Sequence, residues 1–177
     1  SEPFKLPELD PPLELRIERV DIGAVNLNGV QQLQGAELQA DWDEQGLAIR
    51  SLTVRRDDVV LELAGRLLTK ADWPLALEGT AAIRSPNAQP WALKFEVDGE
   101  LRERLVVDLQ SQGYLDAKLS GWVRPLEPDV PANLLLALEN FKAAPELPDA
   151  LRLEALELTV KGDMERGYRL DGNGALQ

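Results

Sequence analysis

Residues 75–83 read Leu-Ala-Leu-Glu-Gly-Thr-Ala-Ala-Ile, and residues 91–97 read Trp-Ala-Leu-Lys-Phe-Glu-Val. In both stretches every second residue is apolar or small, and the residues between them include Glu and Lys. Successive side chains of an extended chain point to opposite sides, so this spacing gives one apolar face and one polar face. The two stretches therefore predict two half-buried β-strands.

The same alternation recurs along most of the chain. It is found at Leu13, Leu15 and Ile17, and then, after a slip of one residue, at Val20 and Ile22; further runs follow at 105–109, 115–119 and 134–138. Turn-forming pairs separate the runs: Asn28-Gly29 is typical of a two-residue hairpin loop, and Asp98-Gly99 indicates a tight turn. The pattern predicts an all-β, mostly antiparallel fold of about a dozen strands.

One segment allows two interpretations. Residues 148–158 are rich in helix-forming residues, and Asp149 is a possible helix cap. The same residues also contain two alternating frames joined by one slip, which is the layout of residues 15–22. The shared layout favours a strand with a β-bulge in both places, and a helix remains open.

Short motifs repeat in order. Gly65-Arg-Leu67 is followed by Trp73-Pro-Leu-Ala-Leu77, and Gly121-Trp-Val123 is followed by Val130-Pro131. Gly99-Glu-Leu101 and Gly162-Asp-Met164 each precede another alternating run. The spacing is loose, but it indicates a unit of a few strands copied along an elongated sheet.

Composition excludes several classes of function. The 177 residues contain no Cys and no His, which leaves no thiol nucleophile, no disulfide, no zinc finger and no Ser-His-Asp triad. The net charge of −12 argues against nucleic acid as a partner, since phosphate binding needs clustered Lys and Arg. Leu occurs 33 times and aromatic residues make up only 5%. This Leu-rich face suits either a plain core or a surface that meets acyl chains.

No motif predicts catalysis, a metal site or a cofactor. Asp41-Trp-Asp-Glu-Gln-Gly46 resembles the start of a calcium loop, but position 12, where a bidentate Glu is required, is Leu52. We therefore expect a turn between two strands, and no enzymatic activity. Four tryptophans stand near predicted strand ends, where they either pack at the rim or contact lipid headgroups or a neighbouring repeat: Trp42, Trp73, Trp91 and Trp122.

Taken together, these motifs resemble a known family. The Gly-x-Leu and Trp-Pro-Leu-x-Leu pairs, the opening at 15–22, the turn at 42–47 and Gly162-Asp-Met164 are similar to the periplasmic repeats of the TamB family, which belongs with the AsmA-like bridge proteins. TamB is the inner-membrane subunit of the translocation and assembly module. The resemblance runs from about Leu13 to the end of the chain. Each motif alone is weak, and the combination carries the resemblance.

The resemblance implies a fold and a role. Its members build a long sheet curled into a U-shaped trough, the β-taco, with an aliphatic concave face; the pattern alone also allows a closed β-sandwich. The family is linked to phospholipid movement between the membranes of Gram-negative bacteria and to outer-membrane biogenesis and protein secretion. The implied partners are phospholipid acyl chains, adjacent repeats of the same full-length chain, and an outer-membrane barrel partner that binds a region absent here.

We therefore expect a Pro-rich extended lead-in over 1–12 and one repetitive β domain over 13–177, an internal piece of a longer periplasmic protein anchored in the inner membrane. Other possible functions are a chaperone-like module that binds outer-membrane protein strands by β-augmentation, and an inert spacer. The predicted lining of a lipid groove consists of Leu15, Ile17, Val20, Ile22, Leu38, Ile49, Leu52, Val54, Leu61, Leu63, Leu75, Leu77, Leu93, Phe95, Leu105, Val107, Leu119, Leu136, Leu138, Leu156 and Leu158.

Overall fold

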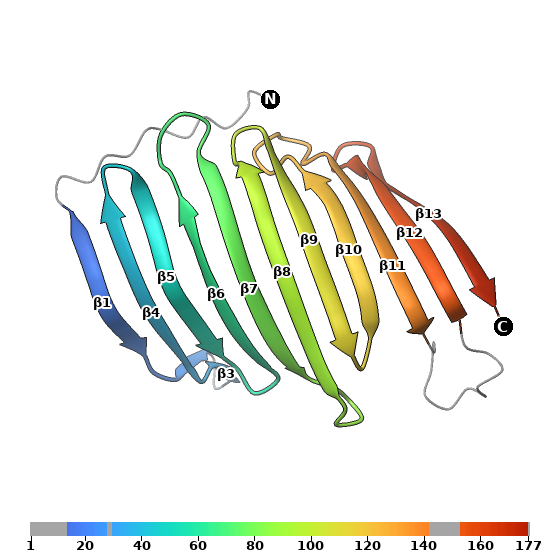
Figure 1. Cartoon of the computed structure of the whole chain (residues 1–177), viewed down its shortest axis with the longest axis horizontal. Coiled ribbons are helices and arrows are strands. Elements are labelled where there is room, and N and C mark those ends of the chain that lie inside the picture. Colours follow the sequence, from blue (N-terminus) through green and yellow to red (C-terminus); the bar gives the residue numbers. More distant parts are fainter. Residues whose placement is uncertain (1–13, 28–29, 142–152, 177) are drawn as a thin grey trace.

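A computed structural model describes residues 14–27, 30–141 and 153–176. Within these ranges the chain forms strands joined by turns and loops (Figure 1). Their bounds are β1 Leu15–Ile22, β2 Val25–Leu27, β3 Val30–Leu33, β4 Gly35–Asp43, β5 Gly46–Arg55, β6 Val59–Leu67, β7 Pro74–Arg84, β8 Pro90–Glu100, β9 Arg104–Gly113, β10 Asp116–Val123, β11 Ala132–Phe141, β12 Leu153–Asp163 and β13 Gly167–Leu176. The all-β prediction is confirmed.

Eleven strands form one open antiparallel sheet in the order β1-β4-β5-β6-β7-β8-β9-β10-β11-β12-β13, and β2 and β3 form a separate hairpin. Apart from the hairpin between β1 and β4, chain neighbours are sheet neighbours, as Figure 1 shows. β1 and β13 are the two edges, so the sheet is a curled trough that does not close. The alternative of a closed β-sandwich is wrong, because the described strands form no second layer over this sheet.

The ambiguous segment and the turns can now be compared with the prediction. β12 begins at Leu153, so the described part of residues 149–160 is a strand; residues 149–152 and the lead-in over 1–12 lie outside the described residues. Leu27 pairs with Val30, as a two-residue hairpin requires, although residues 28–29 themselves are not described. The turn at Asp41–Gly46 is also confirmed.

The turn predicted at Asp98-Gly99 is wrong. Both residues lie inside β8, and the chain reverses over 101–103 instead. Gly99 is needed for another reason: its φ of +140° is a conformation that L side chains rarely adopt, and a Cβ there would collide with the carbonyl oxygen of Arg104 on β9. The Asp98-Gly99 pair therefore marks a position where β8 and β9 approach each other closely, and not a turn.

Two β-bulges keep the apolar residues on one face. The register of β1 against β4 shifts between Ile17 and Val20, which confirms the predicted slip, and the register of β5 shifts between Ile49 and Leu52. Arg50 lies in the second bulge and reaches across β4. Its guanidinium donates a hydrogen bond to the Ile17 carbonyl oxygen at 2.8 Å and forms an ion pair with Asp41 at 3.1 Å. Arg50 therefore fastens the edge strand β1 to the sheet.

The repeated motifs correspond to a repeated contact at one rim of the sheet. In the loop before β7, the carbonyl oxygen of Asp72 accepts a hydrogen bond from the backbone N–H of Arg102, in the β8–β9 turn, at 3.1 Å. In the loop before β11, the carbonyl oxygen of Asp129 accepts one from the N–H of Met164, in the β12–β13 turn, at 2.5 Å. Each loop thus fastens itself to the hairpin two strands further on.

The residue after each of these aspartates is strained in the same way. Trp73 has φ 56° and Val130 has φ 45°, and each precedes a proline. The carbonyl oxygen of Trp73 accepts a bond from the N–H of Leu101 at 3.0 Å, and that of Val130 accepts one from the Tyr168 hydroxyl at 2.6 Å. A non-glycine residue keeps a positive φ only where its surroundings hold it. The loose sequence repeat is therefore a four-strand structural repeat, β6–β9 and β10–β13.

Candidate functional site

One face of the sheet is apolar from edge to edge. Residues directly opposite one another in an antiparallel pair project from the same face, so the register defines rows of side chains that cross the strands. One such row consists of Ile17, Ala40, Ile49, Gly65, Leu77, Val97, Val107, Gly121, Leu134, Val160 and Leu170. The next consists of Val20, Leu38, Leu52, Leu63, Gly79, Phe95, Leu109, Leu119, Leu136, Leu158 and Gly172.

A parallel row lies on each side of these two. The row toward the β8–β9 turn runs from Leu15 through Leu75 and Leu105 to Tyr168, and the row toward the β7–β8 loop runs from Ile22 through Leu61 and Leu93 to Leu156. No charged residue occurs in any of the four rows. We call this surface the apolar face.

All 21 residues predicted to line a groove lie on the apolar face. The structure therefore places on one face residues that are more than 140 positions apart in the chain, such as Leu15 on β1 and Leu158 on β12, which lie toward opposite ends of the sheet. Ile49 and Leu52 share this face only because the β5 bulge intervenes between them. That these residues contact lipid stays a prediction.

Within the described residues no strand covers the apolar face, but its side chains shield one another. Ala81, on this face, is 8% exposed, whereas its neighbour Ala82 on the opposite face is exposed. The two side chains are identical, so their difference in exposure is the result expected when the sheet curves toward the apolar face. Among the described residues, no large side chain is fully buried, so the face is not the interior of a closed core. Most of its Leu side chains are half-buried.

Exposed apolar side chains on this face concentrate at the two edge strands. Leu15 and Ile22 of β1 are 50% and 49% exposed, and Leu170 of β13 is 62% exposed. Residues in the middle of the sheet have neighbours on both sides, and edge residues have them on one side only. The apolar surface therefore continues to both edges of the described sheet.

Two details of the apolar face were missed from the sequence. Phe95 lies over Gly79: a Cβ built on the glycine would collide with the phenylalanine ring, so the ring covers the neighbouring strand. Ser111 is a hydroxyl residue within the four rows, and it is buried. It accepts a hydrogen bond from Trp91 Nε1 at 2.9 Å and donates one to the Leu115 carbonyl oxygen at 2.5 Å. Its polarity is thereby satisfied, and the face stays apolar.

The tryptophans lie at strand ends as predicted. Trp42 is next to the last residue of β4, Trp91 is the second residue of β8, and Trp73 immediately precedes β7 with 6% exposure. Trp122 belongs to the opposite face, where the Arg124 guanidinium stacks 5.6 Å from the ring centroid. The Nε1 atoms of Trp42 and Trp73 are buried without a hydrogen-bond partner.

The opposite face carries the charge. There, the pairing of Glu78 with Glu96 and of Glu96 with Asp108 places like charges directly across neighbouring strands, which costs stability. A shallow hollow of about 440 Å³ on this face is lined in part by Ala48, Ala76 and Glu78. Two of the predicted lining residues, Ile49 and Leu77, also border this hollow, and Arg66, Glu96 and Asp98 add charged groups to it. We interpret this face as the water-facing surface.

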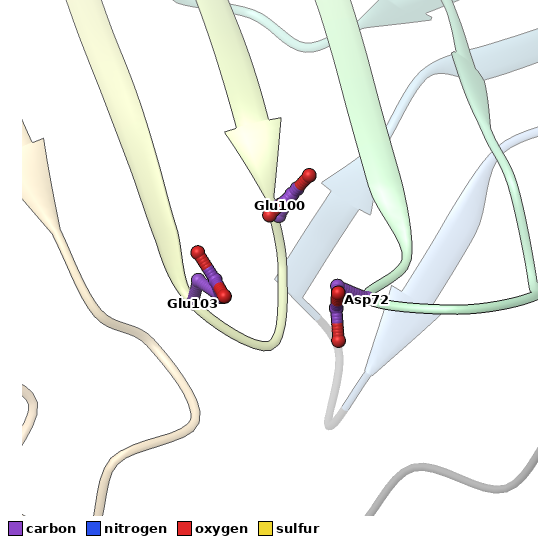
Figure 2. Close-up of side chains that lie close together, drawn as sticks. All are labelled: Asp72, Glu100 and Glu103. Carbon is purple, nitrogen blue, oxygen red and sulfur yellow. The ribbon is translucent and has the colours of Figure 1, made fainter.

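One group of carboxylates could hold a cation. Figure 2 shows Asp72, Glu100 and Glu103, which lie together at the rim where the Asp72 loop meets the β8–β9 turn; their oxygens lie within 4.8 Å of one another. The charge of Glu103 raises the pKa of Glu100, with smaller contributions from desolvation and from Asp72. The group is largely open to water, and mutual repulsion explains the shift.

Among the described residues, none forms a helix with the length and apolarity needed to cross a bilayer.

Comparisons with known proteins now add to this geometry. Neither the curated proteins nor the solved structures contain a match to the chain. The model of one protein family, described as the TamB N-terminal domain, matches residues 1–177. The observed sheet, with its one apolar face, agrees with this family match. The chain belongs to the TamB family.

Proposed function

We propose that this chain is a segment of a periplasmic bridge that shields phospholipid acyl chains from water and conducts them between the inner and outer membranes. TamB proteins form a structural and transport family that is anchored in the inner membrane and lies in the periplasm. The finer role, lipid conduction by this segment, rests on its surface.

The observation that carries the proposal is the unbroken apolar face. Each methylene that leaves water gains about 0.8 kcal/mol. In the two central rows every strand contributes at least one Leu, Val or Ile, so an acyl chain that moves from one strand to the next exchanges one aliphatic contact for a similar one. An inward charge would cost several kcal/mol, and none occurs in the four rows. The predicted mechanism is passive and needs no cofactor.

The dimensions suit acyl chains. Eleven strands make ten spacings of about 4.8 Å, which gives a trough about 48 Å long. The hydrocarbon core of a bilayer is about 30 Å thick for two leaflets, so one acyl chain spans about 15 Å. The described sheet therefore has room for about three acyl chains in sequence. The charged opposite face keeps this surface in solution.

The proposal is tested by photo-crosslinking in the full-length protein. A photo-crosslinking residue at Leu77 or Val107 should give phospholipid adducts, and native mass spectrometry should show phospholipid co-purified with the chain. Val106 is the matched control, because it neighbours Val107 in β9 but lies on the opposite face and is 41% exposed. Protein adducts alone at Leu77 and Val107, or lipid adducts of equal yield at Val106, would contradict the proposal.

The open edges support a second candidate function. Among the described strands, β1 and β13 each have a partner on one side only, and open edges of this kind accept extended peptides by β-augmentation. In this reading the chain acts as a chaperone for outer-membrane protein strands. Crosslinks from edge positions to such proteins, without lipid at Leu77, would favour it. An inert spacer would give neither product. We further propose that an outer-membrane barrel partner binds elsewhere in the longer protein.

A further inference from the structure

The two long rims of the trough, formed by the ends of the strands, differ in charge. The rim at the top of Figure 1 consists of the connections β4–β5, β6–β7, β8–β9, β10–β11 and β12–β13, together with the strand residues that adjoin them. Nine acidic residues lie there, against five basic ones: Asp43, Glu44, Asp72, Glu100, Glu103, Glu127, Asp129, Asp163 and Glu165, against Lys70, Arg102, Arg104, Arg124 and Arg166. We call this the acidic rim.

The negative charge of the acidic rim is concentrated at its middle. The carboxylate oxygens of Asp72, Glu100 and Glu103 lie within 4.8 Å of one another, as Figure 2 shows. Arg124, one of the five basic residues, is already paired with Glu127 at 3.0 Å. An anion that approaches this rim therefore meets an excess of negative charge.

The opposite rim, at the bottom of Figure 1, has no such excess. Its described connections β5–β6, β7–β8 and β9–β10, with the strand residues that adjoin them, contain three basic and three acidic residues: Arg55, Arg56 and Arg84, against Asp57, Asp58 and Asp116. We call this the neutral rim.

The acidic groups of the neutral rim already have donors. Asp58 forms an ion pair with Arg56 at 3.4 Å, and Asp57 accepts a hydrogen bond from the side-chain amide of Gln34. The carboxylate of Asp116 accepts a bond from a backbone N–H of its own turn at 2.9 Å. Each of these negative charges is thereby partly compensated within the protein.

Two cations of the neutral rim are left over. Arg55 and Arg84 are the last residues of β5 and β7, and both are exposed. Within the described ranges neither guanidinium has an ion-pair partner. β5 and β7 are separated only by β6, which places the two residues about 10 Å apart across the sheet. The fields of exposed charges reach about as far at 0.1 M ionic strength, so the two fields overlap.

A phospholipid held by its acyl chains needs a polar place for its headgroup. The four rows of the apolar face contain no charged residue, and a phosphate among them would lack both water and a partner, which is strongly unfavourable. The rows run across the strands, along the trough. The polar groups nearest to the acyl chains are therefore those at the strand ends, in the two rims.

We propose that the phosphodiester groups of phospholipids in the trough lie along the neutral rim, beside Arg55 and Arg84, and that the acidic rim repels them. This proposal rests on the proposed lipid function and adds to it the side of the trough that the headgroups occupy. All lipids would then enter, move and leave in one orientation, with their headgroups at the same rim.

The test uses two forms of phosphatidylglycerol, whose net charge is that of its phosphate. One carries a photoreactive diazirine in the headgroup and the other carries it at the end of an acyl chain. Each is bound to the full-length protein and irradiated, and the labelled peptides are mapped by mass spectrometry. The headgroup probe should label residues 56–58 and 85–89 about threefold more than residues 101–103 and 164–166, a ratio typical of an exposed charge contact.

The two probes separate this proposal from the lipid function itself. The acyl probe should label the apolar face, for example at Leu77 and Val107. If it does so while the headgroup probe labels both rims equally, or the acidic rim more, the orientation is overturned and the lipid function stands. If the acyl probe leaves the apolar face unlabelled, the lipid function is overturned, and the orientation with it.

Charge variants test the cause of the preference. Arg55→Gln combined with Arg84→Gln should bring the labelling ratio of the two rims close to one. The hydrogen bonds at both residues use backbone atoms, so the double variant should fold, and thermal unfolding checks this. Arg66→Gln is the matched control: Arg66 is exposed and lies on β6, between β5 and β7, but near the acidic rim. It should not lower the ratio, and a loss as large as that of the double variant would overturn the proposal.

The acidic rim gives the converse test. Asp72→Asn, Glu100→Gln and Glu103→Gln together should raise headgroup labelling of residues 101–103 about threefold, since they remove the repulsion. In 1 M salt the reach of exposed charges falls to about 3 Å, and the preference of the wild-type protein should largely disappear. A preference that survives both the triple variant and high salt would overturn charge as its cause, and with it the proposal.

Discussion

A charge placed on the apolar face should block lipid binding, whereas the same charge one residue away should not. Leu135 and Leu136 are adjacent in β11 and project from opposite faces. Leu136 lies between Leu119 and Leu158 on the apolar face, and Leu135, which is 40% exposed, lies between Ser120 and Thr159. Neither site faces a charge across the strands, so Leu136→Asp and Leu135→Asp form a matched pair.

The expected magnitude follows from the strand spacing. A chain of about sixteen carbons that spans about 15 Å places about five methylenes over one strand of about 4.8 Å. At about 0.8 kcal/mol each, a hydrated carboxylate at residue 136 removes up to about 4 kcal/mol of contact. Acyl chains can also pass along the row of Leu134, which lowers the loss. We expect lipid occupancy to fall about tenfold or more, since a factor of ten corresponds to about 1.4 kcal/mol.

The assay is the amount of phospholipid that co-purifies with each variant, measured by native mass spectrometry. Leu136→Ala, which shortens the side chain without adding charge, separates the effect of charge from that of lost packing. Thermal unfolding of all variants confirms that the sheet persists. The reasoning is refuted if Leu135→Asp loses as much lipid as Leu136→Asp, or if neither variant loses any.

Three further predictions concern the fold. Arg50→Ala removes the bond to the Ile17 carbonyl oxygen and should destabilise β1 by about 1 kcal/mol, a value reduced for solvent exposure; faster hydrogen exchange confined to β1 would confirm it. Gly99→Ala should lower stability by about 1–3 kcal/mol, because the new Cβ meets the Arg104 carbonyl oxygen; an unchanged urea midpoint would contradict this. Glu100→Gln should raise the thermal midpoint at pH 7. The pKa of Glu100 is raised in the folded state, so stability is lost as the pH rises through that pKa. The difference from wild type should therefore vanish below the unfolded pKa, and a gain that persists in acid would contradict it.

Much of the fold was accessible from the sequence because alternation is a local property. Leu75, Leu77 and Ile83 predict a strand with one apolar face whatever their neighbours are, and the slip between Ile17 and Val20 appears in the sequence as a change of phase. The predicted lining residues fall on one face for this reason, except that Ile49 and Leu52 share it because of the bulge in β5.

Other features depend on contacts between distant residues and could not be predicted in this way. The bulge at Arg50 is visible only once β5 is paired with β4 and β6. Gly99 was mistaken for a turn residue, because its requirement comes from the Arg104 carbonyl on the next strand. The rim contacts of Asp72 and Asp129 join loops to hairpins about 30 residues further along the chain.

The sequence by itself determined the strands, the two faces and the absence of charge from the apolar one, since side-chain direction alternates with period two in any extended chain. Only the tertiary structure decided that no described strand covers this face and that the bulge in β5 places both Ile49 and Leu52 on it. These properties depend on the order of the strands and on the register between them, and such long-range pairing is not encoded in the local pattern.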